Sequence, residues 1–270
     1  MKLFGGFIWI RRNKVDECLI ISFGKKEFHI FDIIGFIKIS IKHIITKQVL
    51  LSNNDIFRFG KYAMYLPMYP VDLIQRTIVD FNDFWEKELL TIIDKYIKQD
   101  FVIADIGSNI GNHTVYWGSK NEVKHVYSFE PVKSTFDILK KNIELNNLQN
   151  KVTAHNIGIS DEKTLGEMYD YNMENIGGVA IFKSQRGNFE LNTIDNLFSE
   201  IKLDFIKIDV EGHEIFVLKG AEKVIKRDKP VIWIESFSDH FNQVDNILKS
   251  YGYKLEKDLL DSNYVYIPVK

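Results

Sequence analysis

The segment LDFIKIDVEGHE places three ionisable side chains, Asp209, Glu211 and His213, directly after an apolar run. Groups this close together change one another's pKa values, as catalytic groups often do. Because open α/β sheets bind their ligands outside the carboxyl ends of the strands, we expect all three side chains to face a reacting centre. The alternative is a group of acids that only stabilises the start of the next helix.

The segment FVIADIGSNIGNHT predicts a strand, a glycine-containing loop and the start of a helix. Glycines let the backbone turn tightly and approach a ligand, and the first helical turn offers unpaired N–H groups. Asn109 suits a left-handed position in this loop. We expect a small polar ligand here, held by Asp105, Ile106, Gly107, Ser108, Asn109, Gly111, Asn112 and Thr114. Turn chemistry without a ligand is the alternative.

Glu130 ends the next apolar run, VKHVYSFEP, where a carboxylate can accept hydrogen bonds from both hydroxyls of a ribose. With Pro131 behind it, the same residue can also stabilise the start of a helix. The glycine loop lacks the G-x-G-x-x-G spacing, and Asp105 would repel a pyrophosphate but can help to hold an ammonium group. We therefore expect S-adenosylmethionine rather than NAD, with Asn156 and Ile157 contacting its adenine. Glu130, Pro131 and Asp209 are also expected among the residues that bind this cofactor.

The elements that position these residues alternate from Phe101 onward, with apolar runs FVIADIG, VKHVYSFEP, KVTAHNIGIS, LDFIKIDVEG and KPVIWIESF separated by helical stretches. This predicts an α/β fold in which helices cover both faces of five parallel strands. The tail YKLEKDLLDSNYVYIP has no room for a crossover helix, so its two strands are expected to be antiparallel. The expected helices are 112–119, 132–145, 213–227 and 240–250.

Five separated segments together resemble the FkbM-type family of S-adenosylmethionine-dependent class I methyltransferases: DIGSNIG, FEP with a helix ending in KKNIELNN, LNTIDNLF, IKIDVEGHE with VLKGA, and PVIWIE. The resemblance covers about Trp85 to Glu235. It implies a Rossmann-like, mostly parallel seven-stranded sheet with an antiparallel C-terminal hairpin. It also implies methyl transfer to a hydroxyl oxygen of a sugar, carried by a nucleotide sugar or a surface glycan in polysaccharide biosynthesis.

Methyl transfer from a sulfonium to an alcohol is an in-line displacement that also requires removal of the hydroxyl proton. We expect His213 to be the base, because imidazole titrates near neutral pH, with Asp209 or Glu211 orienting it or binding sugar hydroxyls. An exposed residue at a helix start is the alternative for His213. Asp209 and Glu235 end neighbouring strands, so they either share a divalent cation or bind sugar hydroxyls.

Residues 1–84 are expected to form an α+β extension that contacts the substrate or another subunit, and residues 85–270 the methyltransferase domain. Strand pairs are expected in ECLIISF with KEFHIFDI and in DIFRFGKYAMYLPMY, followed by one or two helices up to Phe101. The polar segment 169–188 is expected to be a loop that covers the acceptor.

The 270 residues carry a net charge of −2 and one cysteine, Cys18, which argues against a nucleic-acid partner and excludes an internal disulfide framework. Segment 28–45 is apolar but too rich in charge for a membrane span, although an interfacial helix is an alternative. We expect a cytoplasmic enzyme, with a homodimer compatible with the sequence. The competing functions are a catalytically silent binding module in a biosynthetic complex and an NAD-linked oxidoreductase.

Overall fold

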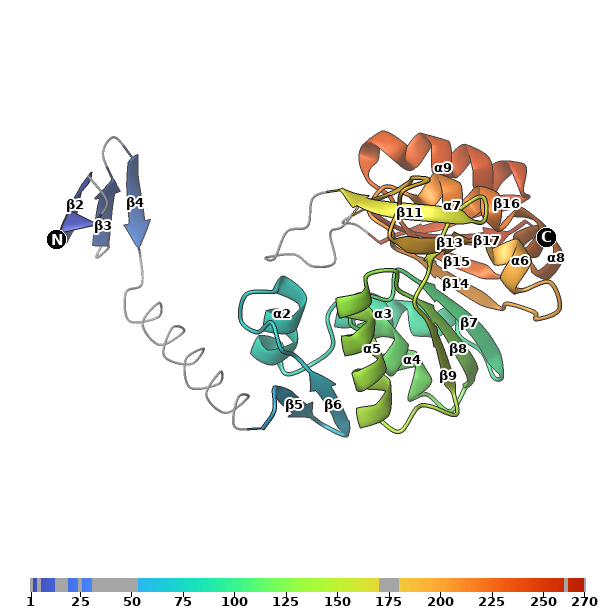
Figure 1. The fold of residues 1–270 in the computed structure, drawn as a ribbon, viewed down its shortest axis with the longest axis horizontal. Coiled ribbons are helices and arrows are strands. Elements are labelled where there is room, and N and C mark those ends of the chain that lie inside the picture. The colour runs from blue at the N-terminus through green and yellow to red at the C-terminus, as the bar shows by residue number, and fades with distance from the viewer. Residues whose placement is uncertain are drawn as a thin grey trace. The chain divides into compact units, whose positions relative to one another are not determined.

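The computed structural model describes residues 2–3, 6–12, 19–23, 26–30, 53–169, 180–259 and 262–269. It divides the chain into two compact units, Met1–Asn54 and Asp55–Lys270. The first unit is an antiparallel sheet of β1 (Lys2–Leu3), β2 (Gly6–Arg12), β3 (Leu19–Phe23) and β4 (Lys26–Ile30), which confirms the predicted pairing of β3 with β4 (Figure 1). The predicted apolar segment 28–45 lies outside the described residues from residue 31 onward.

The second unit is built on a seven-stranded sheet with the order β16-β17-β15-β14-β7-β8-β9. Its parallel strands are β7 (Phe101–Ile106), β8 (Val123–Phe129), β9 (Val152–His155), β14 (Phe205–Ile208) and β15 (Val231–Glu235). β16 (Tyr253–Asp258) and β17 (Asn263–Pro268) form the antiparallel hairpin. The predicted α/β fold, its five parallel strands and its antiparallel tail are therefore confirmed. The strand order reverses between β7 and β14, where such sheets bind ligands.

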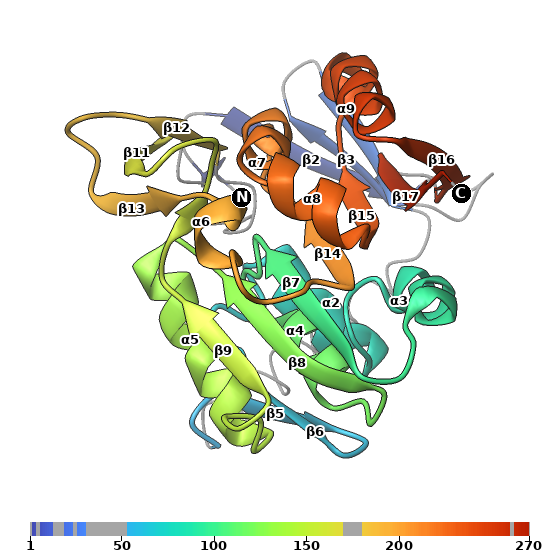
Figure 2. The same ribbon diagram turned by 90° about the vertical axis from the view of Figure 1, so that its right-hand side faces the viewer.

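Helices cover both faces of this sheet (Figure 2). α4 (Asn112–Gly118) and α5 (Lys133–Leu145) lie on one face, where Trp117 of α4 meets Phe205 and Trp233 edge-on. α7 (Glu214–Gly220), α8 (Glu222–Asp228) and α9 (Ser238–Ser250) lie on the other and bury their apolar side chains against alternate residues of β7, β14 and β15. Successive side chains of a strand point to opposite faces, so a nearly continuous apolar run serves both layers of helices, as expected for strands buried on both faces.

The prediction of a single helix over 213–227 was wrong, because the chain there forms two helices, α7 and α8. A Cβ atom on Gly220 would lie 1.9 Å from the carbonyl oxygen of Ser160, so the end of α7 approaches a neighbouring backbone directly. Asp195 of the short helix α6 (Ile194–Leu197) then accepts hydrogen bonds from the backbone N–H groups of Lys223 (3.1 Å) and Val224 (2.9 Å). This side chain from another element caps α8 and starts it as a separate helix.

Residues 55–84 belong by their contacts to the same compact unit as the sheet. They form the predicted strand pair, β5 (Ile56–Phe59) and β6 (Tyr62–Tyr65), and then α2 (Leu73–Phe81). α3 (Lys87–Ile93) and the 3₁₀ turn η1 (Asp94–Tyr96) follow before β7. The side chains of Asn142 and Asn146 accept hydrogen bonds from Tyr65 (2.6 Å) and Ala63 (3.1 Å), which fixes β6 on α5. The role expected for residues 1–84 stays a prediction.

A second sheet has the order β10-β13-β11-β12. It consists of β10 (Gly158–Ile159), β11 (Thr164–Tyr169), β12 (Ala180–Lys183) and β13 (Phe189–Asn192). The segment expected as a covering loop, 169–188, thus includes strand β12, while residues 170–179 lie outside the described residues. In the part of the chain that the structure describes, none of the helices has the length and hydrophobicity needed to cross a membrane.

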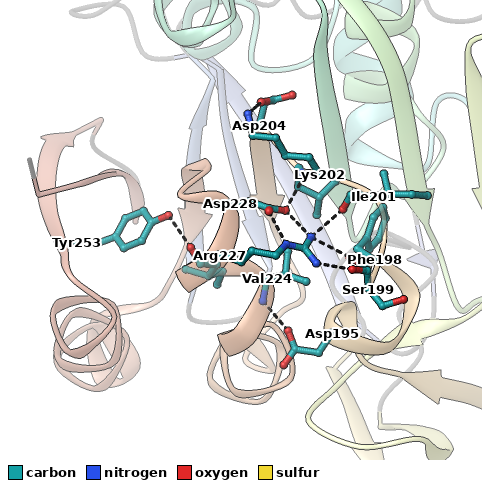
Figure 3. A network of polar contacts seen from close by, with 12 residues as sticks. Asp195, Phe198, Ser199, Ile201, Lys202, Asp204, Val224, Arg227, Asp228 and Tyr253 are labelled. Carbon is teal, nitrogen blue, oxygen red and sulfur yellow. Dashed lines mark hydrogen bonds and ion pairs between the residues drawn. The ribbon is translucent and has the colours of Figure 1, made fainter.

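At the amino ends of β7 and β14, four charged residues form what we term the amino-edge network: Arg227, Asp228, Lys202 and Asp204 (Figure 3). The Arg227 guanidinium donates to the carbonyl oxygens of Ser199 (2.6 Å), Phe198 and Ile201 (both 2.9 Å), and pairs with Asp228 (2.6 Å). Asp228 and Asp204 accept from backbone N–H groups of Leu203 (2.9 Å) and Val102 (3.0 Å). The network therefore ties loop 198–204 to the beginning of the sheet.

Candidate active site

A cavity of about 270 Å³ opens at the carboxyl ends of the parallel strands, and we term it the inner pocket. Five carboxyl groups line it, and no basic side chain of the described residues does. Electrostatics therefore favours a positively charged ligand over a pyrophosphate at this place. The lining residues are Leu73, Ile74, Trp85, Glu86, Gly107, Asn109, Glu130, Asp209, Glu211, Glu235 and Phe237.

The glycine loop brings the backbone of β7 close to that of β14. Gly107 has a φ of +81°, and a Cβ atom on it would lie 1.7 Å from the carbonyl oxygen of Asp209. No larger residue fits there without moving the two strands apart. Asn109 has a φ of 49°, which confirms the left-handed conformation predicted from its sequence position. Gly111, with a φ of 86°, caps α4.

Glu130 lies at the end of β8 with its carboxylate against the loop. Its Oε2 accepts from the backbone N–H of Asn109 (3.0 Å) and its Oε1 from that of Val132 (2.8 Å). Burial raises the pKa of Glu130 to about 7, although both hydrogen bonds favour the charged form. Each oxygen keeps a lone pair, so the carboxylate can still accept from two ligand hydroxyls.

Asn156 and Ile157, predicted to contact adenine, do not line the inner pocket. The side-chain amide of Asn156 donates to the carbonyl oxygens of Glu130 and Pro131, both at 2.9 Å. Asn156 therefore supports the strand end that carries Glu130. Ile157 packs against the apolar core on the α7 side of the sheet.

Asp105 lies beneath the inner pocket and is fully buried. Its Oδ2 accepts from the Thr114 hydroxyl at 2.6 Å, which in turn lies 2.8 Å from the Ser128 hydroxyl. Its Oδ1 has no hydrogen-bond partner among the described residues. Asp105 and Thr114 thus support the floor of the pocket, and Asp105 can act on a ligand ammonium only through space or through water.

The remaining residues predicted from the glycine loop have structural contacts. Ser108 donates its hydroxyl proton to the carbonyl oxygen of Asp105 (2.7 Å). The side-chain amide of Asn112 bonds both the N–H (2.9 Å) and the carbonyl oxygen (3.0 Å) of Trp85. Asn112 therefore fixes a pocket residue that comes from another element. Ile106 is buried in the core.

We define the carboxyl-edge cluster as Lys207, Asp209, Glu235 and Glu86. Lys207 is 3% exposed, and its Nζ lies 2.8 Å from Oδ2 of Asp209. Burial alone would lower the pKa of Lys207, but the carboxylates of Asp209, Asp105 and Glu86 reverse this and raise it. Burial alone would likewise raise the pKa of Asp209, but Lys207 and a hydrogen bond from Glu235 hold it below its usual range. The structure therefore keeps this ion pair charged.

Glu235 behaves in the opposite way. Burial and the charge of Asp209 raise the pKa of Glu235 to about 9. At neutral pH the carboxyl group of Glu235 is therefore protonated, and it donates a hydrogen bond to the carboxylate of Asp209. This pair is a poor fit to the predicted divalent cation, because the ammonium of Lys207 already occupies Oδ2 of Asp209. Among the described residues, no group of three or more His, Cys, Asp or Glu side chains is arranged to hold a metal ion.

The turn after β14 separates the two other predicted catalytic residues. Glu211 has a φ of 51° and lines the inner pocket, where burial and the charges of Asp209 and Glu214 raise its pKa to about 7. The structure does not bring His213 to this pocket. Its Nε2 lies 3.0 Å from the Ser160 hydroxyl, and burial lowers its pKa to about 4.

Sequence reasoning missed Lys207 of the carboxyl-edge cluster and five residues that line the inner pocket: Leu73, Ile74, Trp85, Glu86 and Phe237. A charged residue within the four-residue strand FIKI was a signal for Lys207 that went unused. Trp85 and Glu86 come from the turn between α2 and α3, which no motif marks. Glu86 has a φ of 56°, and its Oε2 lies 3.2 Å from Nε2 of His113.

A second cavity of about 650 Å³, which we term the outer groove, adjoins the inner pocket. Trp85, Glu86 and Glu235 line both cavities. The two cavities therefore meet at these three side chains. The other residues of the outer groove are Thr77, Phe81, Asp83, Phe84, Lys87, Glu88, Leu89 and Asn263.

Comparison with known proteins gives a family and several relatives. The family described as methyltransferase FkbM domain matches residues 105–255. Hexuronic acid methyltransferase AglP of Haloferax volcanii is 31% identical over 163 residues, which cover 56% of this chain and 65% of AglP. Methyltransferase 1 of Beauveria bassiana is 23% identical over 175 residues, covering 55% of this chain and 64% of the relative. The matches thus span less than two thirds of either relative.

Among solved structures, methyltransferase FkbM from Methylobacillus flagellatus is similar to this chain at 20% identity and a TM-score of 0.45. The alignment covers 62% of this chain and 43% of that chain.

Proposed function

This chain belongs to the FkbM methyltransferase family, and from that premise we propose that it transfers the methyl group of S-adenosylmethionine to a hydroxyl group of a sugar. The observation that carries this proposal is the inner pocket, where five carboxyl groups surround a glycine loop at the point where the strand order reverses. A sugar acceptor is favoured by the similarity to AglP, which is named a hexuronic acid methyltransferase. A nucleotide sugar and a glycan are the two carriers of that sugar that the sequence leaves open.

The chemistry of the inner pocket fits S-adenosylmethionine. This cofactor carries an ammonium and a sulfonium, so a pocket lined by five carboxyl groups, with no lysine or arginine among its described lining residues, favours it over the pyrophosphate of NAD. Gly107 lines the pocket where β7 approaches β14, and Glu130 offers two acceptor oxygens to the ribose diol. Bound here, the cofactor would supply an electrophilic methyl group.

The residues at the junction of the two cavities would handle the acceptor proton. Glu235 already holds a proton at neutral pH, so it can donate a hydrogen bond but cannot act as a base. We assign the base to Glu86, the other carboxylate that lines both cavities, with His113 behind it at 3.2 Å. Glu86 would accept the hydroxyl proton of the acceptor, whose oxygen would take the methyl group that the bound cofactor supplies.

The first experiment is a calorimetric titration of S-adenosylmethionine, S-adenosylhomocysteine and NAD into the wild type and the Glu130→Ala variant. We expect the first two to bind and NAD not to bind. Loss of two hydrogen bonds to a carboxylate should weaken binding by roughly 30- to 1000-fold. Glu122→Ala, at the exposed start of β8, is the matched control and should bind like the wild type. Binding of NAD alone would refute the proposal.

The second experiment separates an enzyme from a catalytically silent binding module. Methyl incorporation from labelled cofactor is measured with a panel of nucleotide sugars and glycans. Turnover of a sugar supports the proposed acceptor class. Cofactor binding with turnover only of acceptors from another chemical class would contradict the sugar assignment and leave the cofactor assignment intact.

A further inference from the structure

The outer groove has the position expected of an acceptor site. It shares Trp85, Glu86 and Glu235 with the inner pocket, so a molecule lying in it can reach the place where a methyl group would be presented. Its volume of about 650 Å³ is within the range that holds one or two sugar rings. The charges and rings of its wall should therefore decide which acceptors enter.

The charge of the outer groove is negative. Lys87 is its one cation among the described lining residues, and Nζ of Lys87 is already 3.5 Å from Asp83 and 5.0 Å from the centre of the Tyr116 ring. Glu88 is exposed and, together with Glu86, leaves the groove with more negative than positive charge. An acceptor carboxylate or phosphate placed here would meet like charges.

Aromatic side chains form the remaining wall. Phe81 at the end of α2 is 78% exposed, although large apolar side chains are usually covered. The half-buried Trp85 lines the same groove, whereas Phe84, which also lines it, is only 3% exposed, so Phe81 and Trp85 offer the accessible rings. Aromatic faces next to carboxylates are a combination that binds ammonium groups, through cation–π attraction and ion pairing.

We propose that the outer groove binds the methyl acceptor and selects a hydroxyl compound that carries an amine over one that carries a carboxylate or a phosphate. This inference rests on the proposed methyl transfer and narrows its substrate class. It favours an amino-sugar glycan over a nucleotide sugar, whose diphosphate would be repelled. It also separates this chain from the hexuronic acid that AglP is named for.

Three ligands with the same ring test this selection: the methyl β-glycosides of glucosamine, glucose and glucuronic acid. Each is titrated by NMR into the full chain in the presence of S-adenosylhomocysteine, at neutral pH and low salt. We expect the affinity to decrease in that order, with about a 10-fold difference between the amine and the carboxylate. Added salt should narrow the difference, because it screens exposed charges.

A charge reversal in the groove sharpens the test. Glu88→Lys should weaken the glucosaminide and strengthen the glucuronide, each by a few-fold. Glu122→Lys changes the net charge by the same amount, but Glu122 is exposed just before the amino end of β8, far from the site. This control should leave the order of the three glycoside affinities unchanged.

The proposal is overturned if the glucuronide binds as tightly as the glucosaminide, if Glu88→Lys and Glu122→Lys give the same order, or if none of the three glycosides binds. Failure of the methyl-transfer proposal is distinguished by the two earlier experiments: S-adenosylhomocysteine would not bind in the calorimetric titration, or it would bind and no acceptor would be methylated.

Discussion

Arg227 and Lys207 are cations at opposite ends of the same parallel strands, and their surroundings differ. Arg227, in the amino-edge network, meets three carbonyl oxygens and one carboxylate at 2.9 Å or less. Lys207, in the carboxyl-edge cluster, is one buried ammonium among several carboxylates, of which one must keep its proton. The amino edge matches each charge with a partner, whereas the carboxyl edge holds more negative charge than its own cation neutralises.

Several residues at the carboxyl edge also have an unusual backbone conformation. Glu86, Asn109 and Glu211 line the inner pocket with positive φ values between 49° and 56°, a conformation that non-glycine residues seldom adopt. Strain of this kind persists where the surrounding structure enforces it, often at functional sites. The difference in charge teaches that the sheet is stabilised at its amino edge and keeps unfavourable charge at the edge where a cation would bind.

The largest effect is expected from Lys207→Met, which removes the buried ammonium and keeps most of the side-chain volume. Asp209 would lose its ion pair, so the folded state should lose about 3 to 5 kcal/mol of stability. The pKa of Asp209 should then rise above its unfolded value. Stability of the variant should therefore be greatest at low pH and fall as the pH rises through that raised pKa. Denaturant unfolding across the pH range measures this, and a loss below 1 kcal/mol would show that the ammonium is not needed.

The second largest effect is expected from Glu235→Gln, which should raise the stability of the folded protein rather than lower it. The pKa of Glu235 is raised by burial to about 9 in the folded protein, so the wild type loses stability as the pH rises from the unfolded pKa toward about 9. Glu235→Gln removes this titration and can still donate a hydrogen bond to Asp209. We expect it to gain roughly 2 to 4 kcal/mol near pH 8 and to match the wild type near pH 4.

Thermal unfolding at both pH values measures this gain. Equal stability of Glu235→Gln and the wild type at both would mean that Glu235 is ionised in the folded state. Because Glu235 is uncharged at neutral pH, the same variant should bind S-adenosylmethionine about as tightly as the wild type at that pH.

Sequence patterns were sufficient for the sheet because its determinants are local. The apolar runs, the short tail and the glycine loop each predict their structure from neighbouring residues, and even the left-handed Asn109 followed from its type and place. The break between α7 and α8 was missed, because it depends on Asp195 and Ser160, which are distant in sequence.

The site was predictable only where a side chain follows directly from a strand. Gly107, Glu130, Asp209 and Glu235 end strands or follow them, and all four line the inner pocket. His213 was expected there too, but the turn at Glu211 carries its ring toward Ser160. Because Glu211 and Gly212 have positive φ values, the direction of β14 no longer predicts where the side chain of His213 points. Glu86 reaches the pocket through helix packing, which a motif does not encode.

The third effect, a loss of folding stability, is expected from substitutions of Arg227 in the amino-edge network. Arg227→Met leaves three carbonyl oxygens without a donor and the buried Asp228 without its cation, so we expect a loss of about 2 kcal/mol. Arg227→Lys should recover only part of this, because an ammonium cannot reproduce the planar fork of donors. Affinity for S-adenosylmethionine should be unchanged in both variants. A change in cofactor affinity without a change in stability would contradict the division of the sheet into a stabilising and a binding edge.

The smallest effect is expected from Lys202→Met, which removes the other cation of the amino-edge network. Lys202 is 67% exposed, and Asp204 keeps its hydrogen bond from Val102 when the lysine is lost. Water also solvates the remaining carboxylate, so the loss should be below about 0.5 kcal/mol and should vanish at high salt. Lys202→Met and Lys207→Met remove the same charge by the same substitution from the same sheet. If denaturant unfolding gave equal losses for both, burial could not be the reason that the two edges differ, and the charge imbalance at the carboxyl edge would have no energetic consequence.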